Sequence, residues 1–109
     1  MRITTFNGTG RKVFSIIAGA NSRAADLGIQ SDGKIVVVGF TGGDIALVRL
    51  NSGGNFDTSF SGDGKVSLDF GGIELATSLA IQPSDGRYVL GGYTHDSTQY
   101  DFALVRVLP

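Results

Sequence analysis

Seven side chains from three predicted loops could form a binding surface. The longest loop contributes an acid–base group, a carboxylate, an amide and an aromatic ring, namely His95, Asp96, Gln99 and Tyr100. Residues of these types bind sugars and peptides. Two further connections are expected on the same face of the molecule, and they add Asn21, Arg23 and Glu74. An ordinary solvated loop has the same composition, so a binding role is one hypothesis and turn formation is the other.

Catalysis needs a nucleophile with a base, two poised carboxylates or a metal centre. His95 is the only histidine, and the chain has no cysteine, so thiolate chemistry is excluded. We therefore expect no enzyme and no cofactor. The remaining enzymatic alternative is a hydrolase or lyase that uses a central channel lined by Asp26, Gln30 or Gln82.

Two glycine- and aspartate-rich patterns also have ordinary explanations. Asp57, Asp63 and Asp69 resemble part of a calcium loop but lack its spacing and its closing glutamate, which favours turns and predicts no metal. The stretch from Gly62 to Lys65 precedes a predicted strand, so it has no helix N-terminus that could hold a phosphate group.

The predicted strands that position these residues occur in two copies, because the sequence is a tandem repeat. AADLGIQSDGKIVVVGFT, which begins at Ala24, aligns with ATSLAIQPSDGRYVLGGYT, which begins at Ala76, and DIALVRL aligns with DFALVRV. A period of a few tens of residues is typical of solenoids, propellers and arrays. Residues kept in both copies serve what the copies share, so the aspartates at 44 and 101 and the arginines at 49 and 106 are expected to cap turns and bond between units.

The first copy is predicted to contain four antiparallel strands, at about 24–30, 34–40, 44–50 and 65–70. Asp32-Gly33 between apolar runs predicts a two-residue type I′ hairpin turn. The 17 glycines, with abundant valine, isoleucine and phenylalanine, favour an all-β fold. A unit of about 50 residues with four strands suits one propeller blade. Gly28 and Ala80, small residues at matching positions, suggest close approach near the axis.

The second copy ends after three strands, and its fourth strand is expected at the N-terminus. Residues 5–13 match residues 59–66, so the chain is two permuted blades within a single unit, 1–109. Blade one covers about 24–70. Blade two covers about 75–108 and is completed by a strand at about 11–18, expected to come from a neighbouring chain. The prediction is thus an all-β fold of two four-stranded antiparallel blades per chain, assembling by strand sharing into a closed β-propeller ring.

Several segments are similar to the delta-60 repeat family of bacterial proteins. They read LGIQSDGKIVVVGF, DIALVRLN, FDTSFSGDGKVSLDFGG, LAIQPSDGRYVLGGY and DFALVRV. The resemblance covers nearly the whole chain and implies a β-propeller-like array with no assigned activity, usually present as many copies in large surface or secreted proteins. The family has no catalytic motif to carry over.

Exposed strand edges invite pairing with another chain, and identical subunits that close a ring remove such edges. The expected partner is therefore the chain itself, as a cyclic trimer in preference to a dimer or tetramer. Nine basic and ten acidic residues, spread without runs, favour neither nucleic acid nor membrane as a partner. Met1 as the native start predicts a cytoplasmic location, whereas a fragment of an exported protein would leave the location open.

Three functions are compatible with the predicted fold and loops. The first is a non-enzymatic binding or scaffolding module, with weak multivalent binding of a glycan or peptide by the loop at 94–100. The second is a purely structural cassette of a larger propeller. The third is the channel hydrolase or lyase described above.

Overall fold

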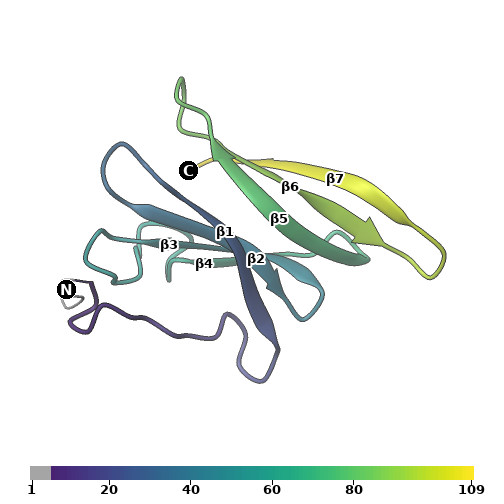
Figure 1. Ribbon diagram of the computed structural model, residues 1–109, viewed down its shortest axis with the longest axis horizontal. Helices are drawn as coiled ribbons and strands as arrows, with labels where there is room; N and C mark the ends of the chain where they lie inside the picture. The colour runs from purple at the N-terminus through teal and green to yellow at the C-terminus, as the bar shows by residue number, and fades with distance from the viewer. Residues whose placement is uncertain (1–5) are drawn as a thin grey trace.

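The computed structural model describes residues 6–109, which form seven β-strands and no helix. Strands β1 to β4 and strands β5 to β7 make two separate antiparallel sheets, and Figure 1 shows the second sheet above the first. The strands are β1 (Ser22–Ile29), β2 (Ile35–Thr41), β3 (Asp44–Leu50), β4 (Lys65–Leu68), β5 (Ile73–Ile81), β6 (Tyr88–His95) and β7 (Tyr100–Val107). The described residues therefore contain no helix long and apolar enough to span a membrane.

Both sheets follow chain order, β1-β2-β3-β4 in sheet one and β5-β6-β7 in sheet two. The repeat aligns β5, β6 and β7 with β1, β2 and β3, and no strand in sheet two corresponds to β4. Among residues 6–109, the outer strand β7 therefore has one unpaired edge, whereas its counterpart β3 pairs with β4.

The core lies between the two sheets, so each sheet has a front face and a back face. The front face carries Val36, Val38, Ile45 and Leu47 in sheet one and the aligned Val89, Gly91, Phe102 and Leu104 in sheet two. The back face carries Leu27, Ile29, Val37 and Val48 in sheet one and the aligned Leu79, Ile81, Leu90 and Val105 in sheet two. The front face of sheet one packs on the back face of sheet two, and this contact forms the core.

Gly28 is where the two innermost strands, β1 and β5, approach closely. A Cβ atom on Gly28 would lie 3.0 Å from Cδ1 of Ile81. Nearby, the amide of Leu79 donates a hydrogen bond to Oδ2 of Asp26 at 2.9 Å. The small residue at this position thus allows the front face of sheet one to meet the back face of sheet two.

A β-bulge interrupts the first strand of each sheet at the same place. The register shifts between Ala24 and Asp26 in β1 and between Ala76 and Ser78 in β5. The residues paired with the start of each bulge are Gly39 and Gly92, where a Cβ atom would lie only 1.9 Å from a backbone carbonyl oxygen. The repeated glycine is therefore required by a close backbone approach at the bulge.

The N-terminal segment repeats the turn that precedes β4. Backbone φ is 54°, 74° and 81° at residues 7, 8 and 10, against 55°, 83° and 81° at residues 61, 62 and 64. In both turns the glycine amide donates to the carbonyl of the phenylalanine four residues earlier, Gly10 to Phe6 and Gly64 to Phe60. Thr5 of this match lies outside the described residues. The common geometry supports the permuted alignment.

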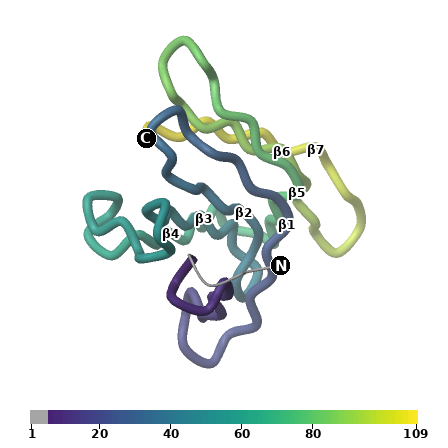
Figure 2. The backbone as a smooth tube through the Cα atoms, turned by 60° about the vertical axis from the view of Figure 1, so that its left-hand side comes forward, coloured from purple at the N-terminus to yellow at the C-terminus, as the bar shows by residue number. Residues whose placement is uncertain are grey.

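Residues 11–18, expected to form a strand with another chain, contain no strand in the single chain. They run along the side of sheet one that faces away from sheet two (Figures 1 and 2). Phe14 packs edge-on against Phe56, and a cavity of about 240 Å³ remains between this segment and the back face of sheet one. The segment therefore covers that face without filling it.

The type I′ turn expected at Asp32-Gly33 is wrong. Of these two residues only Gly33 has a positive φ, of 89°, and the loop closes by hydrogen bonds from the Gln30 amide to the Lys34 carbonyl and from the Gly33 amide to the Gln30 carbonyl. Asp32 keeps a negative φ, with its carboxylate accepting a hydrogen bond from the amide of Lys34 at 3.0 Å. This geometry is typical of a three-residue loop with glycine in the left-handed position.

The substitution Gly92→Ala tests the bulge constraint. Because the new Cβ would collide with the carbonyl oxygen of Leu75, we expect the free energy of unfolding to fall by more than about 2 kcal/mol. The control Gly53→Ala places its Cβ in open space and should change stability by less than about 0.5 kcal/mol. Urea unfolding curves measure both, and equal midpoints for the two variants would contradict the constraint.

Candidate functional site

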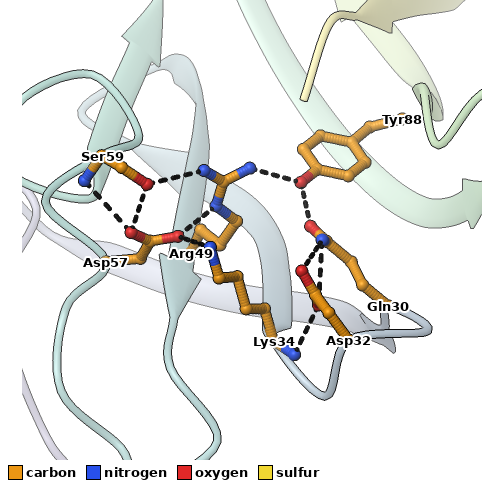
Figure 3. A network of polar contacts seen from close by, with 7 residues as sticks. All are labelled: Gln30, Asp32, Lys34, Arg49, Asp57, Ser59 and Tyr88. Carbon is orange, nitrogen blue, oxygen red and sulfur yellow. Dashed lines mark hydrogen bonds and ion pairs between the residues drawn. The ribbon is translucent and has the colours of Figure 1, made fainter.

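A buried polar network centred on Arg49 joins the two sheets (Figure 3). Arg49, on the front face of sheet one, donates from Nε to Asp57 at 2.7 Å and from Nη1 to the Tyr88 hydroxyl at 3.0 Å. Its guanidinium also lies over the Phe60 ring, 4.6 Å from the ring centroid. The Tyr88 hydroxyl in turn donates to Oε1 of Gln30. Arg49 thus makes the predicted hydrogen bond between repeat units.

Asp57 is the anionic centre of this network. Its carboxylate pairs with Arg49 and with Lys34 at 3.0 Å, and it accepts hydrogen bonds from the amide and hydroxyl of Ser59. The Ser59 hydroxyl, followed by the Lys34 ammonium, the Ser59 amide and Arg49, holds the pKa of Asp57 well below its ordinary value, although burial acts to raise it. Because the charged and polar groups of this network bind one another, the network holds the two sheets together and offers no free group to a ligand.

The segment predicted as a ligand-binding loop, 94–100, is only partly a loop: Thr94 and His95 end β6, Tyr100 begins β7, and residues 96–99 form the turn between them. The Asp96 carboxylate accepts hydrogen bonds from the Thr98 amide and hydroxyl and from the Gln99 amide, and these hold the pKa of Asp96 below its ordinary value. The Gln99 side chain donates to Asp101. Two of the four predicted ligand-binding side chains are therefore engaged in forming the turn.

The other two predicted residues, His95 at the end of β6 and Tyr100 at the start of β7, belong to an aromatic cluster. Tyr100 lies with its ring centroid 4.4 Å from that of His95 and 5.5 Å from that of Tyr93. Tyr100 is largely exposed. This cluster forms the rim of the front face of sheet two.

Asn21, Arg23 and Glu74, predicted on the same face as the loop, have different surroundings. The Asn21 carbonyl accepts a hydrogen bond from Gly42, and Arg23 lies over the Phe40 ring, 5.9 Å from its centroid. Glu74 is buried and lies near Asp44 and Asp69. Among residues 6–109, no side-chain hydrogen bond, ion pair or ring contact joins any of these three residues to His95 or Tyr100.

The outer faces of the two-sheet unit are exposed where their aligned counterparts are buried. Phe102 and Leu104 are 99% and 79% exposed, whereas the aligned Ile45 and Leu47 are fully buried between the sheets. On the opposite side, Leu27 and Ile29 are more than half exposed, whereas the aligned Leu79 and Ile81 pack against the core. The sequence did not single out these residues as a site, although the alignment of the two copies contains the signal.

A groove of about 410 Å³ runs beside the unpaired edge of β7. Its lining includes Phe102 and Leu104 from β7, Ile45 from β3, and Phe70 from the connection after β4. In sheet one the corresponding edge, that of β3, is occupied by β4. The groove therefore lies where sheet two lacks its fourth strand.

Comparison with known proteins gives one family. The family model for a beta-propeller domain of unknown function, DUF5122, matches residues 30–60 and 84–109, together just over half of the chain. The chain belongs to this family. No curated protein and no solved structure gives a significant match. The two antiparallel sheets thus belong to a beta-propeller domain of this family.

The three aspartates whose pattern resembles part of a calcium loop form turns in this chain. Asp57, Asp63 and Asp69 each accept a hydrogen bond from the amide two residues later, at 3.1, 2.9 and 2.8 Å. The channel residues of the enzymatic alternative are also bonded within the chain, since Asp26 accepts from Leu79 and Gln30 from Tyr88. Oε1 of Gln82 is buried without a hydrogen-bond partner among the described residues.

The lowered pKa of Asp57 predicts a stability that depends on pH. The folded-state pKa lies below the unfolded value of about 3.9, so the contribution is present above about pH 4 and is lost as the pH falls toward the folded value. Asp57→Asn should therefore lower the urea midpoint at pH 7, and its difference from wild type should shrink below about pH 3.

The control for this experiment is Asp63→Asn. Asp63 is exposed and its carboxylate bonds only to the Lys65 amide among the described residues, so the variant should match wild type at both pH values. A difference for Asp57→Asn that stayed constant between pH 7 and pH 3 would contradict the role of the charge.

Proposed function

We propose that this chain is a non-enzymatic scaffold whose copies assemble, blade face against blade face, into a closed β-propeller ring. One observation carries the proposal: exposed apolar side chains on the front face of sheet two, and at Leu27 and Ile29 on the back face of sheet one, are the counterparts of side chains buried in the core. A second copy of the chain is the partner that brings the missing surface.

The aligned residues define how two copies would meet. Inside the chain, Ile45 and Leu47 are covered by the back face of sheet two, which includes Leu79 and Ile81. Between copies, Phe102 and Leu104 would be covered by the back face of sheet one of the next copy, which carries Leu27 and Ile29. Burial of exposed side chains as large as these favours association.

The unpaired edge of β7 supports the same arrangement. Exposed edges template pairing with another strand, and residues 11–18 follow a turn with the geometry of the one before β4. We infer that this segment from a second copy completes sheet two along β7. The incompletely filled cavity beneath the segment in the single chain is consistent with a segment that serves another partner.

An interface between a front face and a back face is heterologous, and it closes into a ring when the rotation allows. Propellers have four to eight blades, so two blades per chain give a dimer, trimer or tetramer, of which we favour the six-bladed trimer. The chain resembles delta-60 repeats, which usually occur in many copies, and this agrees with a propeller built from several copies of the same blade. The alternative is a structural cassette whose next blades lie elsewhere in a longer chain.

Binding of a glycan or peptide at the 94–100 loop has less support. The exposed Tyr100 ring offers a stacking surface, but Asp96 and Gln99 are bonded within the turn. A catalytic role has even less support than ligand binding. Among residues 6–109, no hydrogen bond joins the His95 side chain to a serine or a carboxylate that would make it part of a nucleophilic pair.

Self-association is tested by the substitution Phe102→Asp. Light scattering on a sizing column should give wild type a mass of two, three or four times 11.4 kDa. Phe102→Asp should be a monomer, because it places a charge on the face that a second copy would cover.

The matched control is Leu108→Asp. Leu108 is also exposed, but it aligns with Asn51, which is an exposed polar residue. This variant should keep the wild-type mass. A monomeric wild type, or an equal loss of mass in both variants, would refute assembly through this face.

A further inference from the structure

Three carboxylates meet where the turn between β2 and β3 lies against the connection from β4 to β5. Asp44 begins β3, Asp69 follows β4, and Glu74 lies in β5. One oxygen from each lies within 4.8 Å of the others. The cluster therefore brings residues of sheet one and sheet two together at one end of the strands.

Glu74 makes this cluster unlike an ordinary group of surface acids. The residue is only 5% exposed, and its Oε1 accepts a hydrogen bond from the Gly72 amide at 3.1 Å. Its Oε2 is buried and has no hydrogen-bond partner among residues 6–109. A buried carboxylate oxygen without a partner is costly and calls for a compensating group.

No described basic residue supplies that compensation. The ion pairs among residues 6–109 are Lys34 with Asp57, Arg49 with Asp57, and Arg87 with Asp85. None involves the three clustered carboxylates. Three acids at this separation repel one another unless a cation or shared protons reduce their charge.

The fold itself does not require the buried acid. In sheet one the residue at the position of Glu74 is Ser22, paired with Thr41 as Glu74 is paired with Thr94. The Ser22 hydroxyl donates to Oγ1 of Thr41 at 3.0 Å, so this position is satisfied by a neutral side chain. The position of Asp69 is likewise taken by Ile16 in the permuted alignment.

We propose that Asp44, Asp69 and Glu74 bind a calcium ion. The site offers only oxygen donors, which hard cations prefer, and Ca²⁺ accepts irregular carboxylate geometry with water at its other positions, whereas Mg²⁺ demands a near-ideal octahedron. The ion neutralises the buried Glu74 and ties sheet two to the turn between β2 and β3. Ring assembly is not needed for this site, because all three residues belong to one chain.

Calcium binding to the full chain is tested by titration calorimetry and by thermal unfolding with Ca²⁺ or EDTA. We expect binding by wild type and a melting temperature that rises with Ca²⁺, since a ligand that binds the folded state stabilises it. Glu74→Gln should weaken Ca²⁺ binding at least about tenfold, because it removes one ligand charge. The control Asp63→Asn should bind Ca²⁺ as wild type does.

A second readout does not depend on the stability of the variants. In wild type, Ca²⁺ should shift the amide resonances of Gly71 and Gly72, which donate to Asp69 and Glu74. With EDTA, Glu74→Gln should melt above wild type, because an uncompensated charge has been removed. Two results would overturn the site: no calorimetric binding together with unshifted glycine amides, or equal affinity for wild type and Glu74→Gln. Protons shared among the three carboxylates would then be what compensates their charge.

Discussion

The contact on which the rest of this structure depends is the packing of the front face of sheet one on the back face of sheet two. Both sheets carry large apolar side chains, and this contact buries the front face of sheet one and the back face of sheet two, which stabilises the fold. One contact buries one face of each sheet, and it is locked by a polar joint in which Arg49 of sheet one reaches Tyr88 of sheet two. The same contact leaves the two outer faces of the chain as mutual complements.

The junction inside the chain and the proposed junction between copies differ in chemistry. Tyr88 aligns with Ile35, which has no hydroxyl group, and Arg106, which aligns with Arg49, is exposed in the single chain. The acidic cluster around Glu74 is also specific to the internal junction. In the proposed ring, junctions pinned by polar groups would therefore alternate with junctions held by apolar burial, and the latter would be the first to separate.

The repeat in the sequence predicted the seven strands of the two sheets and their order, because alternation and turn residues are local signals. The strand that it predicted at 11–18 is not formed in the single chain. The repeat did not predict the turn at Asp32, where the side chain bonds to the Lys34 amide, nor the bulges that make Gly39 and Gly92 necessary. For the candidate site, the sequence identified the residue types at 95–100, but the hydrogen bonds of Asp96 and Gln99 within the turn are seen only in the structure. The cluster of Asp44, Asp69 and Glu74 depends on packing between sheets, which residue spacing does not encode.

The central claim, that copies meet as the two sheets meet, is tested most directly by a designed cross-link. Gly28 touches Ile81 inside the chain, so the aligned Ala80 of one copy should lie against Ile29 of the next. The chain has no cysteine, and the double variant Ile29→Cys with Ala80→Cys places thiols on its two opposite outer faces. We predict that a short thiol cross-linker joins the double variant into covalent oligomers that end at one ring mass, while a mixture of the two single variants stops at a cross-linked pair. A double variant that remains monomeric on a denaturing gel would contradict the claim.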